Sequence, residues 1–316
     1  MTVLLADLYT EHRRFLWSLC YRMLGSAPDA EDVVQDTLVR AIERPPRRTD
    51  SPIRPWLVQV ALNRSRDLLR RRRRRDYVGP WLPSPIDTGD EAAPPAHEPE
   101  SESSAARGPA PASYDLLESV SFAFLLALEA LTPPQRGVLL LRDVFDYSVK
   151  DTADALAMTQ ATVKTTHYRA RQAMKAYDRR RQIPTADAQG SARATLTAFL
   201  LCLEHHDVRG VEALLAENVR TMTDGGGEFQ AALRPIVGRD KVTRFYLAVA
   251  ATGPDLHVRM PTLNGMPGVV VTVPSAAGRQ APRFALTIDV DRDGKISCVY
   301  VVSATRKLTA LERLPT

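Results

Sequence analysis

The sequence predicts a multidomain protein in which two all-α helical domains precede an α+β domain. Apolar residues recur at helical spacing through residues 1–75 and again through residues 113–181. The stretch between them is rich in Pro, Ala, Ser and acidic residues, a composition that does not form a core. After residue 191, a helical segment gives way to runs of alternating apolar residues, which are typical of strands. A chain of 316 residues is long enough for two or three such domains.

The first domain is expected to contain three helices. Gly25 ends the first, and Pro28 opens the second, whose first turn carries acids where the helix dipole favours them. Pro45 ends that helix, and a proline-started third helix follows Ser51 or Arg54. The core face of the first helix is expected to contain Leu8, Phe15, Leu16, Leu19, Cys20 and Met23. The core face of the third is expected to contain Trp56, Leu57, Val60, Ala61 and Leu68.

The second helical domain is expected to end in a pair of helices joined by a tight turn. Residues 113–131 predict one helix, and Thr132 is expected to cap the next, with Pro133 in its first turn. Residues 148–177 predict a short helix, a turn at "MTQ" and a longer helix with a polar, basic outer face. Such a face suits a helix-turn-helix in the DNA major groove, and the alternative is a helical hairpin with a solvated face. The inner face is expected to contain Val163, Ala170, Met174 and Tyr177.

The last domain is expected to begin with helical residues 192–219 and to continue with strands. Strands are expected within residues 256–265, 267–273 and 283–302. In the last of these, "DRDG" lies between two apolar runs, which predicts a hairpin turn.

The charge pattern indicates a polyanionic partner that is contacted at two places. Residues 1–80 carry 16 Lys/Arg against 10 Asp/Glu, and residues 164–181 carry seven against one. Residues 87–103 between them carry six acids and no Lys or Arg. Two basic clusters separated by an acidic spacer are typical of nucleic-acid-binding proteins.

Other classes of protein are excluded by composition. No apolar run is long enough for a membrane span, and the N-terminus lacks the features of a secretion signal. The three cysteines, Cys20, Cys202 and Cys298, are far apart and form no CxxC pair. They predict reduced thiols in a cytoplasmic protein, with no metal site and no cofactor.

Three motifs together resemble regions 2 and 4 of bacterial sigma factors of the extracytoplasmic-function (ECF) type, in the sigma-70 family. They are "LGSAPDAEDVVQDTLVRAI", "PWLVQVALNRSRDLLRRRRRR" and "LTPPQRGVLLLRDVFDYSVKDTADALAMTQATVKTTHYRARQAM", in this order. The resemblance implies a factor that directs promoter recognition and transcription initiation by RNA polymerase, and that is not an enzyme. The implied partners are core polymerase, through its beta-prime and beta subunits, and promoter DNA.

The resemblance also implies which residues carry these roles. Residues expected to bind core polymerase are Asp29, Glu31, Asp32, Gln35 and Asp36. Residues expected to read the minus-ten element are Asn63, Arg64, Arg66, Asp67, Arg70 and Arg71. Residues expected to read the minus-thirty-five element are Ala161, Thr162, Lys164, Thr165, Tyr168, Arg169, Arg171, Gln172 and Lys175.

These assignments have simpler alternatives. The acids are also explained by the helix N-terminus. Arginines 71–75 suit phosphate contacts or a solvated basic tail. Trp56 matches a position of the family, but its spacing favours a core residue.

The last domain resembles the SnoaL-like (NTF2-like) fold, a cone-shaped sheet with helices. A subgroup of ECF sigma factors carries this domain fused at the C-terminus, and "YVGPWLPSPI" (residues 77–86) resembles the linker signature of that subgroup. We therefore expect Trp81 and Leu82 to dock, on a proline-stiffened segment, against the last domain. The residues expected to form this regulatory contact are Tyr77, Trp81, Leu82, Asp224, Gly225, Gly226 and Gly227.

The chain departs from the subgroup at two places. Glu228 follows the glycines, where the subgroup has Lys, and residues 304–308 ("ATRKL") replace an Asn-Pro-Asp-Lys-Leu tail. Both changes alter charge, so the regulatory contacts are expected to differ in partner or strength.

Enzymes of the SnoaL-like fold use pocket acids and histidines, and the candidates here are His205, His206, Asp207 and Asp224. Asp207 is more simply the cap of the next helix, and the triple glycine is a turn more often than an anion cradle. A fold does not carry an activity with it, so we expect a regulatory domain and no catalytic residue.

The expected organisation is then as follows: residues 1–75 form sigma region 2, 76–112 a linker with the docking segment, 113–181 sigma region 4, 182–190 a short linker and 191–316 the SnoaL-like domain. Two rival hypotheses are a SnoaL-like cyclase, isomerase or hydratase with a DNA-binding appendage, and a helix-turn-helix repressor. A small ligand of unidentified chemistry in the last domain is left open.

Overall fold

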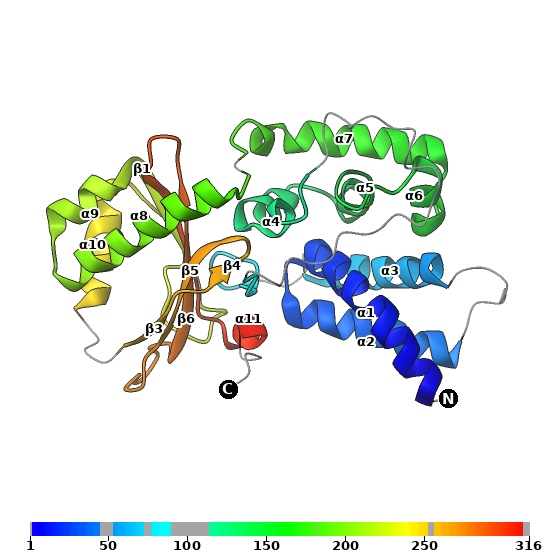
Figure 1. Cartoon of the computed structure of the whole chain (residues 1–316), viewed down its shortest axis with the longest axis horizontal. Coiled ribbons are helices and arrows are strands. Elements are labelled where there is room, and N and C mark those ends of the chain that lie inside the picture. The colour runs from blue at the N-terminus through cyan, green and yellow to red at the C-terminus, as the bar shows by residue number, and fades with distance from the viewer. Residues whose placement is uncertain are drawn as a thin grey trace. The chain divides into compact units, whose positions relative to one another are not determined.

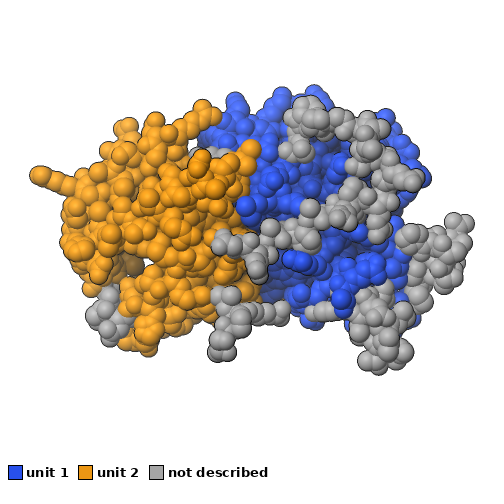
Figure 2. Space-filling model, viewed as in Figure 1, with its two compact units in different colours: residues 1–75, 93–182 blue, residues 76–92, 183–316 orange. Residues whose placement is uncertain are grey.

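The fold was obtained as a computed structural model, which describes residues 2–44, 53–72, 77–89, 114–181, 183–251 and 256–311, with side chains from Thr10 onward. The chain divides into two compact units (Figure 2). Unit 1 contains residues 1–75 and 93–182, and unit 2 contains residues 76–92 and 183–316. The docking segment (residues 77–89 of those described) therefore belongs with the C-terminal domain.

Three helices begin unit 1: α1 (Thr2–Leu24), α2 (Ala27–Glu43) and α3 (Arg54–Arg72) (Figure 1). Gly25 ends α1 with a φ of 62°, and the Ser26 side chain caps α2. The expected core face of α1 is confirmed from Phe15 to Met23, while the side chain of Leu8 lies outside the described residues.

The prediction for the core face of α3 is partly wrong. Leu57 and Ala61 are buried, but Trp56, Val60 and Leu68 are only half-buried. The buried face is rotated because α3 contacts α1 and α2 as well as α5 and α6. Its buried residues are Leu57, Val58, Ala61, Leu62, Ser65 and Leu69.

The expected single helix over residues 113–131 is also wrong. It is replaced by a 3-10 turn, η2 (Glu118–Val120), and a short helix, α4 (Phe122–Leu128). Ser121 has extended backbone between them, and its hydroxyl caps α4 by accepting from the Phe124 amide. Thr132 then forms the expected cap of α5 (Pro133–Asp143), as part of a capping box with Gln135.

Helices α6 (Val149–Leu156) and α7 (Gln160–Asp178) form the predicted helix-turn-helix. Ala157 turns the chain with a φ of 52°, and the Thr159 side chain caps α7. Val163, Ala170 and Met174 are fully buried on the inner face of α7, as predicted, while Tyr177 is only half-buried.

Unit 2 is an α+β domain built on a mixed, seven-stranded sheet. Its helices are α8 (Ala186–Glu204), α9 (Val208–Leu214), α10 (Arg239–Ala250) and α11 (Thr305–Leu308), with a final 3-10 turn, η3 (Thr309–Leu311). Its strands are β1 (Leu215–Asp224), β2 (Ile236–Val237), β3 (His257–Arg259), β4 (Thr262–Leu263), β5 (Met266–Thr272), β6 (Arg283–Val290) and β7 (Ile296–Val302). The strand order is β2-β1-β7-β6-β5-β3, with β4 paired to β5.

The sheet has a different cover on each face. Helices α8, α9 and α10 lie on one face, where Phe199, Tyr246 and Val299 belong to the core (Figure 1). The docking segment and α11 lie on the other face (Figure 1). The "DRDG" hairpin joins β6 to β7 as predicted.

Candidate functional site

The outer face of α7 carries most of the residues expected to read the minus-thirty-five element. The exposed members are Ala161, Thr162, Lys164, Thr165, Tyr168, Arg169, Gln172 and Lys175. Tyr168 is 65% exposed, which is unusual for a large side chain in a folded unit. The face is held in place by the buried residues on the opposite side of the helix.

Arg171 does not lie on this face. Its guanidinium contacts the carboxylates of Asp143, at 3.6 Å, and Asp178, at 3.4 Å, and lies 5.1 Å from the centre of the Tyr114 ring. His167 also contacts Asp143, at 2.7 Å. The structure thus directs Arg171 toward the interior of unit 1, apart from the other expected DNA-reading residues.

The acids expected to bind polymerase lie on α2, and two of them are paired within unit 1. Glu31 accepts from Arg13 at 2.9 Å and is only 15% exposed. Asp36 forms an ion pair with Arg64 of α3. Asp32, Gln35 and Asp36 are exposed, so the accessible part of this group is its C-terminal half.

The residues expected to read the minus-ten element lie along α3. Asn63, Asp67, Arg70 and Arg71 are exposed, and Arg66 is half-buried. Burial and the neighbouring Arg70 lower the pKa of Arg66. Arginines 73–75, expected as phosphate contacts, lie outside the described residues.

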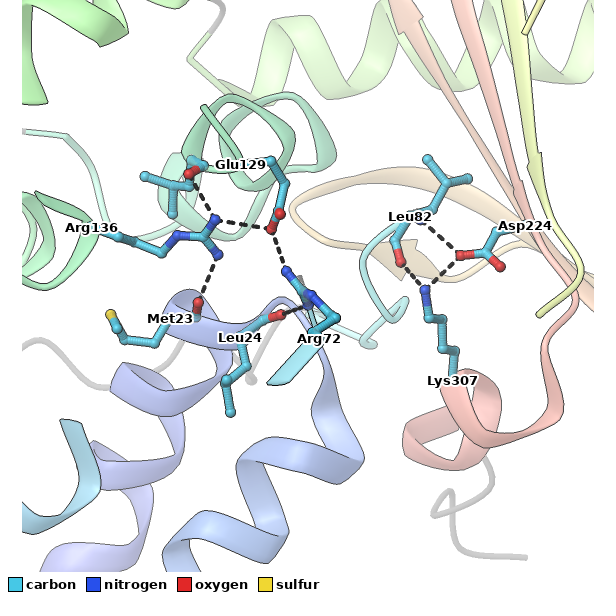
Figure 3. A network of polar contacts seen from close by, with 9 residues as sticks. Met23, Leu24, Arg72, Leu82, Glu129, Arg136, Asp224 and Lys307 are labelled. Carbon is cyan, nitrogen blue, oxygen red and sulfur yellow. Dashed lines mark hydrogen bonds and ion pairs between the residues drawn. The ribbon is translucent and has the colours of Figure 1, made fainter. Parts of the chain in front are cut away.

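The end of α3 is held by an arginine cluster that joins the two helical regions of unit 1. Arg72 donates to the Leu24 carbonyl and to Glu129, each at 2.7 Å (Figure 3). Arg136 is almost fully buried and donates to the carbonyls of Met23 and Leu128, each at 2.8 Å (Figure 3). Glu129 also contacts Arg136 at 3.0 Å.

Arg22 joins the same two regions through hydroxyl and carbonyl acceptors. It is buried, and its guanidinium donates to the Ser18 carbonyl and hydroxyl, to the Ser119 hydroxyl and to the Leu116 carbonyl. Burial lowers its pKa to about 9, which leaves it charged at neutral pH.

The docking segment forms a buried polar site with β1 and the C-terminal helix. The Asp224 carboxylate, at the end of β1, is fully buried. Its Oδ1 accepts from the Tyr77 hydroxyl at 2.7 Å, and its Oδ2 accepts from the Leu82 amide at 2.8 Å. Leu82 is itself buried on the sheet. The structure therefore brings Tyr77, Leu82 and Asp224 together.

The positive charge at this site comes from Lys307 of α11, a residue that the sequence analysis did not assign. Its Nζ donates to the Leu82 carbonyl at 2.5 Å and to Asp224 Oδ2 at 2.6 Å (Figure 3). It lies 4.4 Å from the centre of the Trp81 ring and 4.9 Å from that of Tyr77, positions typical of cation–π contacts. The sequence contains one signal for this role: residues 304–308 differ from the tail of the subgroup but keep its final Lys-Leu pair, at 307–308.

A second contact holds the segment farther along. The backbone N–H of Ile86 donates to Asn264 Oδ1 at 2.9 Å, and the backbone N–H of Asn264 donates to the Ile86 carbonyl at 3.0 Å. The Thr88 amide donates to the Thr262 carbonyl at 2.8 Å. The segment therefore adds backbone pairing to the β4 turn.

The glycines form a turn beside this site. Gly226 and Gly227 have φ values of 60° and 78°, which other residues rarely adopt. The Gly226 amide donates to Asp224 Oδ1 at 3.0 Å, so the turn helps to position the carboxylate. An open pocket of about 360 Å³ lies next to it, lined by residues that include Val78, Gly79, Phe229, Leu233 and Arg279.

The residues considered for catalysis do not form one site. Asp207 caps α9 by accepting from the Gly210 amide at 2.9 Å, as predicted. His205 and His206 are exposed at the end of α8, while Asp224 ends β1. On the helix-covered face of the sheet, Tyr246 is buried, and its hydroxyl forms a hydrogen bond of 2.6 Å with the Thr221 hydroxyl within the core.

Within the described part of the chain, no cluster of three or more His, Cys, Asp or Glu residues is arranged to hold a metal ion. Likewise, none of the described helices combines the length and apolarity that a membrane span requires.

Two protein families match the helical regions in the expected order. Residues 8–75 match Sigma-70 region 2, and residues 121–174 match Sigma-70, region 4. The ECF RNA polymerase sigma factor SigJ of Mycobacterium tuberculosis is 29% identical over 303 residues, which cover 94% of this chain and 91% of SigJ. SigG of the same organism is 34% identical over 239 residues, which cover 70% of this chain and 62% of SigG.

The structural comparison covers the same large part of the chain as the sequence comparison with SigJ. The crystal structure of the M. tuberculosis extracytoplasmic function sigma factor SigJ superposes with a TM-score of 0.67 and 25% identity, over 94% of this chain and 96% of SigJ. The match includes the C-terminal α+β domain as well as both helical regions. The chain belongs to the ECF sigma factors of the sigma-70 family, in a form that carries a C-terminal α+β domain, and it is an RNA polymerase sigma factor.

Proposed function

We propose that the parts of this sigma factor divide its work as follows. The exposed acids of α2 bind the beta-prime subunit of core polymerase, and the region 4 helices contact the beta subunit. The polar and basic face of α3 reads the minus-ten element, and the outer face of α7 reads the minus-thirty-five element. These roles place the protein with polymerase and DNA in the cytoplasm, and the chain catalyses no reaction of its own.

The observation that supports the DNA-binding role of α7 is that its two faces differ in burial and in charge. Val163, Ala170 and Met174 of its inner face are fully buried, and its outer face is exposed and carries Lys164, Arg169 and Lys175. A helix so presented fits the major groove, where cationic side chains contact phosphates and polar ones contact base edges.

The C-terminal domain is proposed to regulate the factor in cis by binding the docking segment. Tyr77 follows the end of α3 by only five residues, so docking restricts the chain that connects region 2 to region 4. The contact combines the buried Leu82 side chain with the buried Lys307–Asp224 ion pair, and both partners of that pair hydrogen-bond to the Leu82 backbone. Weak contacts suffice in any case, since domains on one chain have effective concentrations on the order of millimolar.

Docking is proposed to hold a less active state. A doubly substituted chain, Trp81→Ala with Leu82→Ala, then directs more run-off transcription with core polymerase than the native chain does. Chains that end near Pro184 and near Lys307 separate the contribution of the whole domain from that of the tail. If the substituted chain keeps both its domain packing and its promoter activity, regulation through this segment is wrong.

Polymerase binding is tested separately. Asp32→Lys on the exposed face of α2 is expected to weaken binding to core polymerase, while Glu43→Lys, exposed at the end of the same helix, serves as the matched control. Equal binding by both variants contradicts the role of the α2 acids. Tight duplex binding without polymerase, unaffected by Asp32→Lys, favours a repressor instead.

A further inference from the structure

The centre of the exposed face of α7 carries no charge. Ala161, Thr165, Tyr168 and Gln172 follow each other at intervals of three or four residues, so they form one stripe along the helix. This stripe lies opposite the buried inner face. At 100° per residue, Lys164 and Lys175 lie on one side of the stripe and Arg169 lies on the other. A neutral stripe between cationic edges matches a major groove, whose base edges lie between two phosphate backbones.

The hydroxyl groups near the start of the stripe already form hydrogen bonds within the helix and its cap. Thr165 Oγ1 donates to the Ala161 carbonyl at 3.1 Å, so its hydroxyl hydrogen is already used. The Thr162 hydroxyl contacts the Thr159 hydroxyl at 2.8 Å, within the cap of the helix. What Thr165 offers to a ligand is therefore chiefly its methyl group, next to the methyl group of Ala161.

The third member of the stripe is also apolar over most of its area. Tyr168 is 65% exposed, and its ring is the largest apolar surface on the outer face of α7. The first three members of the stripe lie in the N-terminal half of α7, and they present two methyl groups and an aromatic ring. HTH recognition helices contact base edges with their N-terminal residues, so this half is the part that meets the bases.

Among the four bases, thymine alone presents a methyl group in the major groove, and alanine, the threonine methyl and aromatic rings contact it. Guanine is recognised most often by arginine or lysine at O6 and N7. Arg171, which belongs to the expected reading residues, faces Asp143 and Asp178 instead. We infer that Ala161, Thr165 and Tyr168 recognise thymine methyl groups in the minus-thirty-five element, while the flanking Lys164, Arg169 and Lys175 contact phosphates.

This inference rests on the proposed placement of α7 in the major groove, and it adds the base that is read there. The first test selects promoter duplexes, randomised over the minus-thirty-five element, by their binding to the holoenzyme formed from the full chain and core polymerase. Thymine is expected at two or more adjacent positions of the selected elements. Selected elements that lack thymine on both strands overturn the inference.

The second test removes only the methyl group from the DNA. Deoxyuridine replaces each thymine of a selected element in turn, because it keeps the pairing and the groove acceptors of thymine. Holoenzyme binding is expected to weaken about fourfold at each position under the stripe, the effect of leaving one methyl group unburied. Deoxyuridine at thymines outside both promoter elements is the control and is expected to have no effect.

The third test removes one group at a time from the protein. Thr165→Ser keeps the hydroxyl and its bond to Ala161, but removes the methyl group. It is expected to weaken binding by a similar factor and to abolish the response to deoxyuridine at one position. Thr165→Val keeps the methyl group and removes the hydroxyl, and it is expected to preserve that response.

The outcomes separate this inference from the proposed function. If transcription depends on the minus-thirty-five element but deoxyuridine changes nothing, α7 reads DNA in another way and the inference is wrong. If Thr165→Val loses the thymine preference and Thr165→Ser keeps it, the hydroxyl is the reading group and the inference is again wrong. If the holoenzyme selects no minus-thirty-five sequence, the proposed role of α7 itself fails.

Discussion

Replacing Lys307 by methionine tests the site that binds the docking segment. Methionine keeps the unbranched apolar part of the side chain and removes the ammonium group. The change eliminates a charged hydrogen bond to the Leu82 carbonyl and two ring contacts, to Trp81 and Tyr77. A charged hydrogen bond contributes about 1.5–3 kcal/mol and each cation–π contact about 0.5–1 kcal/mol. Because these contributions are not additive, docking is expected to weaken by about 2–4 kcal/mol.

The carboxylate of Asp224 adds to this effect. In the docked state it remains buried without its cation, whereas release of the segment allows water to reach it. The loss of about 2–4 kcal/mol alone shifts the equilibrium between docked and released segment toward release by roughly 30-fold to 700-fold, since about 1.4 kcal/mol corresponds to a factor of ten, and the carboxylate moves it further in the same direction.

Native-state hydrogen exchange measures this shift at the Leu82 amide, which donates to Asp224. Its protection is expected to fall by that factor, while the amides paired between β6 and β7 lose far less. Arg306→Met, exposed and adjacent on the same helix, is the control and is expected to leave Leu82 protected. Unchanged protection at Leu82, or an equal loss at Leu82 and in the sheet, refutes the reasoning.

Three further predictions concern unit 1. Glu129→Gln removes the acid that contacts Arg72 and Arg136, so the free energy of unfolding of unit 1 is expected to fall by about 1–2 kcal/mol in denaturant titrations, with exposed Asp154→Asn as a near-neutral control. Lys164→Ala is expected to reduce the slope of log K against log salt for promoter binding by about 1, and an unchanged slope argues against a phosphate contact. Burial and bonds to carboxylates raise the pKa of Tyr114 and Tyr177 well above 10, so the folded chain keeps protons that the unfolded chain releases. Stability is therefore fully present below pH 10 and is expected to fall above it by up to about 1.4 kcal/mol per pH unit for each tyrosine, a dependence that Tyr→Phe variants lose.

Local signals made much of the fold predictable. Pro28, Thr132 and Asp207 mark helix starts because they act on the backbone within one turn. The β6–β7 hairpin is predictable for the same reason. Strand β1 was missed, since its early polar residues, Glu217 and Asn218, interrupt the alternation and its parallel partner β7 lies about eighty positions later in the chain.

The candidate site was predictable only in part. The docking segment stands out because a tryptophan among prolines is unusual in a linker, and Asp224 lies beside the glycines that suggested it. Lys307 was not assigned because its role depends on contacts with Leu82, 225 positions away. The inward direction of the Arg171 side chain also depends on tertiary contacts. Helical periodicity places Arg171 at the edge of the outer face, and only its contacts with other helices decide which way the side chain turns.

The ion pairs of unit 1 connect the proposed polymerase-binding role of region 2 with its proposed DNA-binding role. Several basic side chains near the expected DNA-binding faces already contact acids of the same unit: Arg64 contacts Asp36, Arg72 contacts Glu129, Arg171 contacts Asp143 and Asp178, and Arg181 contacts Glu118. A DNA phosphate must displace the acidic side chain before it can pair with any of these arginines. Breaking an exposed ion pair costs little free energy, and breaking a buried one costs more. Asp36 belongs both to the acids proposed to bind polymerase and to the pair that holds Arg64. Binding of Asp36 by polymerase would therefore release an arginine of α3 for the minus-ten element, which joins the two proposed roles of region 2 through one carboxylate.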